Sequence, residues 1–352
     1  MKSLDIRYLS RLHFTADQAA SLKRIGESKG RQDLFSRQTP EVLKTLCQAA
    51  IIESSESSNR LEGIVAPHAR IEAIVKKSSN PRNRPEQEIA GYRDALNLVH
   101  ESGTHMPFTE NVILQLHAYL YRYLPENGGK WKLTENSIVE KNPDGTVRRV
   151  RFAPVKAAAT PEAMATLVRN YKEALEVHRQ EPLVVVPAAI LDFLCVHPFH
   201  DGNGRTARLL TLLLLYHFDY QVGRYISLER LFEESKESYY ETLEYSSQGW
   251  HEAKHDIMPW MTYFWGVMIK AYREFEERVD NIRTGRGSKT DQIRQAVARR
   301  IGPFAISDIE NDCPGISRDM VRVVLRQLKE EGAISPQGKG RGARWVKRGE
   351  HA

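Results

Sequence analysis

Residues 197–208 read HPFHDGNGRTAR and lie between two apolar stretches of the chain, 183–196 and 209–218. Both stretches have the spacing of buried helices, and neither reaches the roughly 20 residues that a membrane-spanning helix needs. Helices on both sides would hold the segment rigidly at its two ends. We therefore expect an ordered polar loop inside a helical protein.

The loop contains the residue types of an anion-binding site. Gly202 and Gly204 leave room for backbone N–H groups to approach phosphate oxygens, and a helix beginning near Arg205 brings the positive end of its dipole to the same place. Arg205 and Arg208 are three residues apart, so both can point at one ligand from the first helical turn. The alternative explanation is a connecting turn with glycine caps and solvated arginines.

Two further residues add chemistry to this loop. Asp201 supplies a hard oxygen ligand, and Mg²⁺ in proteins is commonly held by one or two carboxylates together with phosphate oxygens. The ordinary pKa of a histidine such as His197 suits proton removal near neutral pH. A base, a cation ligand and a phosphate site so close together favour phosphate chemistry over a simple turn.

Most of the remaining sequence also has helical periodicity. A helix that opens at Thr39-Pro40-Glu41 should run to Glu62, where Gly63 is a natural left-handed C-cap. Residues 131–152 differ, because β-favouring residues flank the turn sequence Asn142–Gly145, and they predict a β-hairpin. Further helices are expected at residues 87–100, 109–123, 161–179, 184–196, 205–218 and 228–282.

The composition is typical of a cytoplasmic, reduced, multidomain protein with no membrane partner. The chain has 352 residues, of which 41% are hydrophobic and 27% charged, and this length suggests two or three domains. The N-terminus lacks the apolar segment of a signal peptide. Cys47, Cys195 and Cys313 are too few and too far apart to indicate a disulfide framework or a zinc cluster.

The basic excess of the chain lies near its C-terminus. Counted from their charged residues, residues 281–352 carry a net charge of +7, whereas the whole chain carries +6. Residues 283–290 are Gly-rich and basic, and we predict a linker there. The pattern beyond this segment resembles a winged-helix domain, with three helices followed by two strands around a basic loop. These elements are expected at residues 291–300, 307–311, 317–331, 334–337 and 344–347.

A basic winged helix predicts contacts with DNA phosphates, which supply affinity and little sequence information. The arginines that the third helix and the wing would offer to DNA are Arg318, Arg322, Arg326 and Arg341. The alternative is that this domain docks a protein or packs within a dimer.

Residues 197–208 match the signature HxFx(D/E)GNGRxxR at every specified position, and the chain resembles the Fic family from about residue 35 to residue 268. The resemblance implies a mainly α-helical core with a β-hairpin flap over the active site. The domains it implies are an N-terminal helical region at 1–85, a Fic core at 86–282, the linker at 283–290 and the winged helix at 291–352.

Fic proteins typically transfer AMP from ATP to a Ser, Thr or Tyr hydroxyl of a protein, so the resemblance implies ATP, Mg²⁺ and a protein substrate, with self-modification expected. It makes His197 the general base and places Mg²⁺ on Asp201, between the α- and β-phosphates. The implied phosphate ligands are Gly202, Asn203 and Gly204 in the cradle, Arg205 at the β-phosphate and Arg208 toward the γ-phosphate.

A second motif implies regulation. Residues 58–63, SNRLEG, fit the inhibitory pattern (S/T)xxxE(G/N) through Ser58, Glu62 and Gly63, placed before the core as in class II Fic proteins, which are often homodimers. Glu62 paired with Arg208 would occupy the place of the γ-phosphate, and ATP would then bind with its α-phosphate misplaced for in-line attack. An ordinary helix end is the alternative explanation. Removal of AMP by the same protein is left open.

The flap resembles the family less closely. Ile138 fits the pattern, but Val139 and Glu140 stand where small residues are expected beside the nucleotide base, and Glu140 would disfavour ATP relative to another donor. Tyr239 and Tyr240 stand where relatives keep tyrosines beside the adenine, with helix core packing as the alternative.

The leading hypothesis is therefore an autoinhibited protein adenylyltransferase. One alternative is a DNA-binding regulator in which the Fic core senses a nucleotide, and another is a Fic enzyme that uses UTP or transfers phosphate. The intact His197 favours an enzyme, since sensing a nucleotide requires no base.

Overall fold

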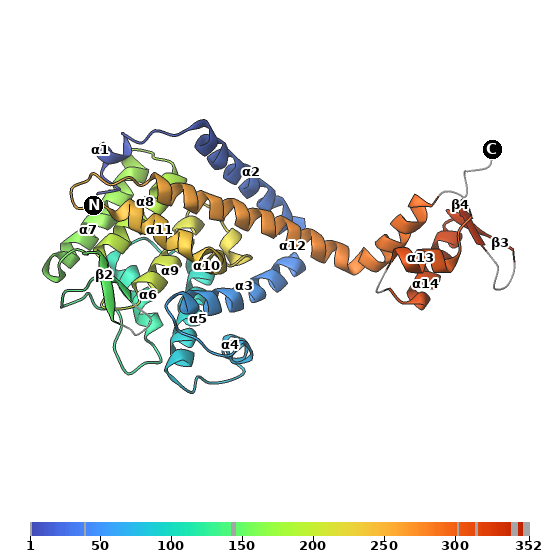
Figure 1. Cartoon of the computed structure of the whole chain (residues 1–352), viewed down its shortest axis with the longest axis horizontal. Helices are drawn as coiled ribbons and strands as arrows, with labels where there is room; N and C mark the ends of the chain where they lie inside the picture. Colours follow the sequence, from blue (N-terminus) through green and yellow to red (C-terminus); the bar gives the residue numbers. More distant parts are fainter. Residues whose placement is uncertain are drawn as a thin grey trace. The chain divides into compact units, whose positions relative to one another are not determined.

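The computed structural model describes residues 2–38, 40–141, 146–300, 303–313, 316–338 and 344–347. It divides the chain into two compact units, Met1–Glu276 and Glu277–Ala352. The first unit contains both the predicted N-terminal region and most of the predicted core. The fold is mainly helical, with one small antiparallel hairpin in the first unit, as the sequence predicted (Figure 1).

The first unit is built from helices that surround two central ones, α8 and α9. Its helices are α1 (Ile6–Leu9), α2 (Ala16–Gln38), α3 (Pro40–Leu61), α4 (His68–Val75), α5 (Arg84–Ser102), α6 (Glu110–Leu120), α7 (Thr160–Lys172), α8 (Pro182–Val196), α9 (Asn203–Tyr216), α10 (Leu228–Glu234), α11 (Lys236–Ser247) and α12 (Met258–Arg299), which continues into the second unit. Short turns of other helix types lie at Ala157–Ala159, Glu173–Val177 and Val222–Arg224. Nearly every residue of α8 and α9 is buried, so the loop between them is anchored in the core.

Local sequence explains where several of these helices begin. The Asn83 side chain accepts a hydrogen bond from the Glu86 N–H at the start of α5, and Thr109 does the same for Val112 at the start of α6. Helix α2 lies against the first half of α12, where the Gln18 side chain bonds the Thr262 hydroxyl (Figure 1).

A proline inside α8 is accommodated by two tryptophans of α12. Pro187 has no N–H, so the Leu183 carbonyl one turn earlier loses its partner within the helix. The Trp265 indole N–H donates to that carbonyl at 2.8 Å, and the Trp260 indole N–H donates to the Pro187 carbonyl at 2.9 Å. Both tryptophans are almost completely buried and belong to the core of the unit.

The predicted hairpin is present as strands β1 (Ile138–Lys141) and β2 (Val147–Phe152), which pair antiparallel with Ile138 opposite Phe152. Its register has two irregularities, one after Ile138 and one after Glu140. The predicted turn at Asn142–Gly145 lies outside the described residues.

The second unit contains the expected order of elements after α12. Helices α13 (Ile306–Asp312) and α14 (Arg318–Glu330) precede strands β3 (Ile334–Gln337) and β4 (Arg344–Lys347), which pair antiparallel. The amphipathic helix α14 buries one face in the core of this unit through Val321, Val324, Leu325 and Leu328.

Residues 283–290, where we predict a linker, have a helical backbone that is part of the continuous helix α12. Gly285 and Gly287 each disfavour a helix by only about 1 kcal/mol relative to alanine, and helical sequence on both sides outweighs that. Among the described residues, none of the helices combines the length and the apolar character needed to cross a membrane.

Candidate active site

Two residues in left-handed conformation bracket the loop between α8 and α9, which we call the motif loop (residues 197–202). His197 ends α8 with φ 50° and ψ 60°, and its N–H still bonds the Phe193 carbonyl at 2.9 Å. Gly202 precedes α9 with φ +80°, a conformation that side chains rarely adopt. The chain therefore reverses sharply at both ends of the loop.

Asn203 closes the loop from within. Its Oδ1 accepts the Phe199 N–H at 2.9 Å, and its Nδ2 donates to the Phe199 carbonyl at 2.8 Å. The sequence predicted that Asn203 cradles phosphate, but the structure shows its side chain fully engaged with Phe199. Its backbone N–H, at the start of α9, is the group that this residue can still offer to an anion.

The predicted anion site corresponds in the structure to the N-terminus of α9. Within the described part of the chain, no side chain caps this helix, so the N–H groups of Asn203, Gly204 and Arg205 lack acceptors in the helix. A Cβ atom built on Gly204 would lie 2.2 Å from Glu62 Oε1, which shows how closely the Glu62 carboxylate approaches this helix end. The site thus already contains a negative group.

Arg208 forms the predicted pair with Glu62. Its NH2 group donates to Glu62 Oε1 at 2.8 Å and to the Ser58 carbonyl at 2.8 Å, and its Nε donates to Ser58 Oγ at 2.8 Å. The Arg208 side chain is 2% exposed and that of Glu62 is 32% exposed. Gly63 follows with φ +79° and ends α3 as the expected left-handed cap. The structure therefore brings Ser58 and Glu62 to Arg208, and Gly63 follows the helix that carries them.

Arg205 is buried and already has an anionic partner. Its NH1 group donates to Glu88 Oε2 at 2.6 Å, and its NH2 group lies 3.4 Å from Asp201 Oδ2. Its Nε is a buried donor that has no partner among the described residues. Sequence reasoning missed Glu88, since a glutamate in the polar opening turn of α5 gives no signal of a distant arginine.

Asp201 presents an accessible carboxylate beside the anion site. Its side chain is 63% exposed, and Oδ2 accepts from the Tyr121 hydroxyl at 3.1 Å. Partial burial raises the pKa of Asp201, but the Arg205 charge and hydrogen bonds from the Gly202 N–H and Tyr121 outweigh it and lower that pKa overall. The described residues contain no group of three or more His, Cys, Asp or Glu side chains that could hold a metal alone. An ionised carboxylate beside a phosphate site fits Mg²⁺ that also binds nucleotide oxygens and water.

His197 has the tautomer and charge state of a general base. Its Nδ1 lies 3.3 Å from the Leu194 carbonyl, which can only accept, so Nδ1 carries the proton and Nε2 has the free lone pair. Burial, followed by the charge of Lys132, lowers the pKa of His197 to about 4. The ring is therefore neutral at physiological pH.

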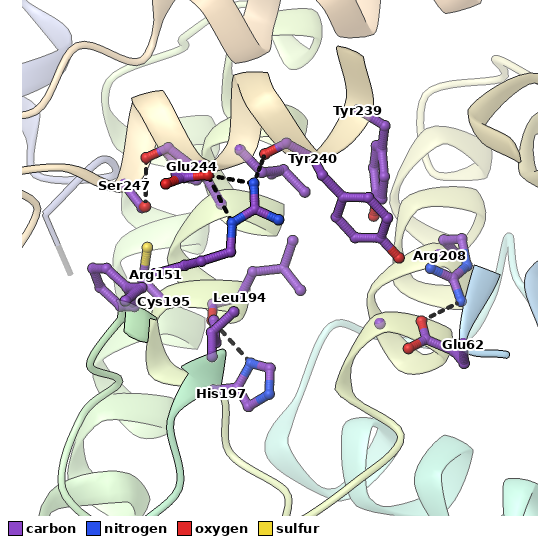
Figure 2. Close-up of a pocket in the computed structure, with 15 residues that line it drawn as sticks. Glu62, Arg151, Leu194, Cys195, His197, Arg208, Tyr239, Tyr240, Glu244 and Ser247 are labelled. Carbon is purple, nitrogen blue, oxygen red and sulfur yellow. Dashed lines mark hydrogen bonds and ion pairs between the residues drawn. The ribbon is translucent and has the colours of Figure 1, made fainter. Parts of the chain in front are cut away.

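One pocket is lined by His197, Gly204 and the Glu62–Arg208 pair. His197 faces the Glu62–Arg208 pair across it (Figure 2). The lining residues are Glu62, Ile138, Arg151, Phe152, Leu191, Leu194, Cys195, His197, Gly204, Arg208, Tyr239, Tyr240, Leu243, Glu244 and Ser247.

The predicted flap residues reach this pocket unequally. Ile138, Tyr239 and Tyr240 line it, and the Tyr240 hydroxyl donates to the Leu61 carbonyl at 3.2 Å, beside Glu62. Val139 and Glu140 are not lining residues. The Glu140 carboxylate instead accepts hydrogen bonds from two arginines of β2, Arg148 and Arg149, each at 2.7 Å. The base-contact prediction for Val139 and Glu140 stays a prediction, and the ion pairs hold the Glu140 carboxylate on β2.

Sequence reasoning also missed the polar groups at the inner end of the pocket. Arg151 of β2 donates from Nε to Glu244 Oε2 at 2.6 Å and from NH2 to the Tyr240 carbonyl at 3.3 Å (Figure 2). This pair joins the hairpin to α11. A basic strand gives no sign of a distant glutamate, so the sequence carried no usable signal for it.

The predicted DNA contacts lie in the second unit, away from this chemistry in the sequence. Arg318 lies 3.5 Å from Glu310, Arg322 pairs with Asp319 at 3.1 Å, and Arg326 is exposed on the same helix. Arg341 lies outside the described residues.

The fold is mainly helical, and one pocket, lined in part by the β-hairpin, brings together Glu62, His197 and Arg208. Residues 107–215 match the family model described as the Fic/DOC family. A stretch of 73 residues, 20% of this chain, is 33% identical to a Fido domain-containing protein of Dictyostelium discoideum. The match spans about half, 51%, of that relative.

Solved structures of similar fold include three Fic proteins. A Fic family protein from Desulfovibrio desulfuricans has a TM-score of 0.62 and 21% identity, covering 97% of this chain and 98% of its own. A Fic domain-containing signaling protein from Bacteroides thetaiotaomicron has a TM-score of 0.60 at 20% identity, over 73% and 97% of the two chains. Fic-1 of C. elegans has a TM-score of 0.57 at 19% identity, over 76% and 74%. Residues 107–215 therefore match the Fic/DOC family, and the fold of the chain is similar to that of solved Fic proteins.

Proposed function

We propose that this protein is an adenylyltransferase that moves AMP from ATP to a hydroxyl group of a protein and is held inactive by Glu62. The observation that carries the proposal is the pairing of Glu62 with Arg208 at the uncapped N-terminus of α9, in one pocket with the neutral base His197. Members of the Fic family typically catalyse nucleotidyl transfer, which supports the same class of reaction.

The side chains and N–H groups of this site suffice for an in-line displacement. The target hydroxyl oxygen attacks the α-phosphorus while His197 Nε2 takes its proton, and the bond from that phosphorus to the β-phosphate oxygen breaks, so AMP stays on the protein and diphosphate leaves. The N–H groups at the start of α9 and the Arg205 guanidinium stabilise the charge on the leaving group. Mg²⁺ bound at Asp201 would neutralise phosphate charge when present.

Inhibition follows because Glu62 and a nucleotide phosphate would compete for the Arg208 guanidinium. Arg208 is the buried guanidinium that a terminal phosphate would reach, and Glu62 already occupies it with a carboxylate. A nucleotide that cannot place its last phosphate there binds with the α-phosphorus shifted from the line of attack, and small displacements of this kind lower rates strongly. Removing Glu62 therefore frees the site without changing the base.

We propose further that the second unit binds DNA through α14, with Arg322 and Arg326 contacting phosphates. Support comes from the exposure of both side chains on a helix whose opposite face is buried. This role is compatible with either the enzyme or the nucleotide-sensing alternative.

A donor comparison tests the proposed reaction. Wild type, Glu62→Gly and Glu62→Gly/His197→Ala are incubated with Mg²⁺ and α-³²P-ATP, γ-³²P-ATP or α-³²P-UTP. We expect covalent label from α-³²P-ATP alone, at least tenfold more in Glu62→Gly than in wild type and none in the double variant. Label from γ-³²P-ATP or from α-³²P-UTP would contradict AMP transfer and identify a different donor reaction. Label that survives His197→Ala would refute the role of His197 as the base.

A further inference from the structure

One side of the motif loop is bonded to the chain segment that leads into the hairpin. Five carbonyls of the loop and its borders each accept a hydrogen bond from one of three residues, His117, Lys132 and Asn136. Lys132 Nζ donates to Val196 (3.2 Å), Asn136 Nδ2 to His197 (3.4 Å) and Phe199 (2.9 Å), the Lys132 N–H to Pro198 (2.8 Å), and His117 Nε2 to Asp201 (3.0 Å). We call these three residues the clasp.

His117 is fixed from three directions. Its Nε2 donates to the Asp201 carbonyl, its Nδ1 accepts the Gly129 N–H at 2.9 Å, and its ring stacks on Phe199 with centroids 3.7 Å apart and planes within 5°. A donor on one nitrogen and an acceptor on the other specify the neutral Nε2–H tautomer. The side chain therefore joins α6, the start of the flap segment and the motif loop.

The bond from His117 also orients the carboxylate of Asp201. A trans peptide places the carbonyl of one residue opposite the N–H of the next. Holding the Asp201 carbonyl on His117 therefore turns the Gly202 N–H to the opposite side of the peptide, and this N–H helps to lower the pKa of the Asp201 carboxyl. A Cβ on Gly202 would lie 3.3 Å from His117 Nε2, so the contact is close.

Lys132 and Asn136 extend this connection to the hairpin. Lys132 is 4% exposed, and its Nζ donates to Asn136 Oδ1 at 2.8 Å. Asn136 stands two residues before β1 begins at Ile138. The position of the flap and the backbone of the motif loop are therefore set by the same hydrogen bonds.

We infer that His117, supported by Lys132 and Asn136, is a positioning residue for the proposed transfer: it holds the Asp201 carboxylate in place through the Asp201–Gly202 peptide and couples that peptide to the flap. The inference rests on the proposed function only for the reaction in which the Asp201 carboxylate would take part. Partners that orient a metal ligand typically change metal affinity or activity by about 10–100-fold when removed.

The test compares His117→Phe, which keeps a stacking ring and loses both hydrogen bonds, with His117→Gln, which keeps a donor. Both are made in a Glu62→Gly chain. The matched control is His217→Phe, because His217 also bonds a backbone carbonyl, that of Met106 at 2.7 Å, outside the site. We expect His117→Phe to raise the Mg²⁺ concentration for half-maximal labelling about tenfold or more, with partial recovery in His117→Gln and no change in the control.

Hydrogen exchange without nucleotide or metal supplies a second readout. Peptides covering residues 196–206 and 129–140 should exchange faster in His117→Phe, while those from α8 stay protected and His217→Phe matches its parent. Unchanged exchange in both peptides, or an unchanged Mg²⁺ requirement, would overturn the inference. If the Glu62→Gly parent labels from no donor, the proposed function fails, and exchange alone then decides the positioning role.

Discussion

Gly204 offers a sharp test of how closely Glu62 occupies the anion site. A Cβ atom at this position would lie 2.2 Å from Glu62 Oε1 and 3.2 Å from Arg208 NH1. Oε1 is at the end of a flexible side chain, so in Gly204→Ala the carboxylate must move away and lose its hydrogen bond to Arg208. The backbone of Gly204 is helical, so the substitution brings no backbone strain.

The two opposing effects have similar size. Replacing glycine with alanine in a helix stabilises by about 0.5–1 kcal/mol. A hydrogen bond to a charged group contributes about 1.5–3 kcal/mol, and the 32% exposure of Glu62 favours the lower end of that range. In wild type, Gly204→Ala should therefore leave the free energy of unfolding nearly unchanged or lower it slightly. In a Glu62→Ala chain it should stabilise by about 0.5–1 kcal/mol.

Urea unfolding of the four proteins measures this coupling as the difference between the two effects of Gly204→Ala. We expect about 1–2 kcal/mol. Gly26→Ala in α2 is the matched control, since a Cβ there meets nothing within 4 Å and its effect should not depend on Glu62. Additivity within about 0.5 kcal/mol at Gly204 would refute the contact.

Three further outcomes follow from particular contacts. Trp265→Phe removes the donor to the Leu183 carbonyl and should lower the stability by about 1–3 kcal/mol in thermal unfolding. In a Pro187→Ala chain, where residue 187 again has a helical N–H, the same substitution should lower the stability less. Labelling by Glu62→Gly should keep its rate from pH 8 down to about pH 5, because the pKa of about 4 leaves His197 neutral above that value; a fall beginning near pH 6.5 would contradict the burial effect. Arg322→Glu/Arg326→Glu should weaken retention of duplex DNA at low salt and reduce the salt slope by about 1 per arginine, and equal retention would dispose of DNA binding by α14.

The parts of the site that the sequence predicted are those encoded within one stretch of chain. The motif loop, Gly202 and the start of α9 follow from neighbouring residues, and the helix ending at Gly63 follows from its local cap signal. The Glu62–Arg208 pair joins residues far apart in sequence, and only the resemblance to a family motif linked them.

The missed parts depend on contacts between distant segments. Glu88 and Arg151 look like ordinary surface charges in the sequence, and His117 looks like a polar interruption of a helix; each becomes part of the site only when the helices pack. Helix α2 was not expected because its residues are mostly polar and lack a clear apolar stripe. At 283–290, glycine content suggested a linker, and the backbone is helical because helical sequence lies on both sides.

The central claim is that Glu62 blocks a working nucleotidyl transfer site. Its most direct test is the intact mass of Glu62→Gly after incubation with Mg²⁺ and ATP, beside wild type and Glu62→Gly/His197→Ala. The account predicts that the mass of Glu62→Gly rises by one AMP group, while wild type and the double variant stay largely unmodified. An unchanged mass in all three proteins, or a gain of phosphate in place of AMP, would contradict it.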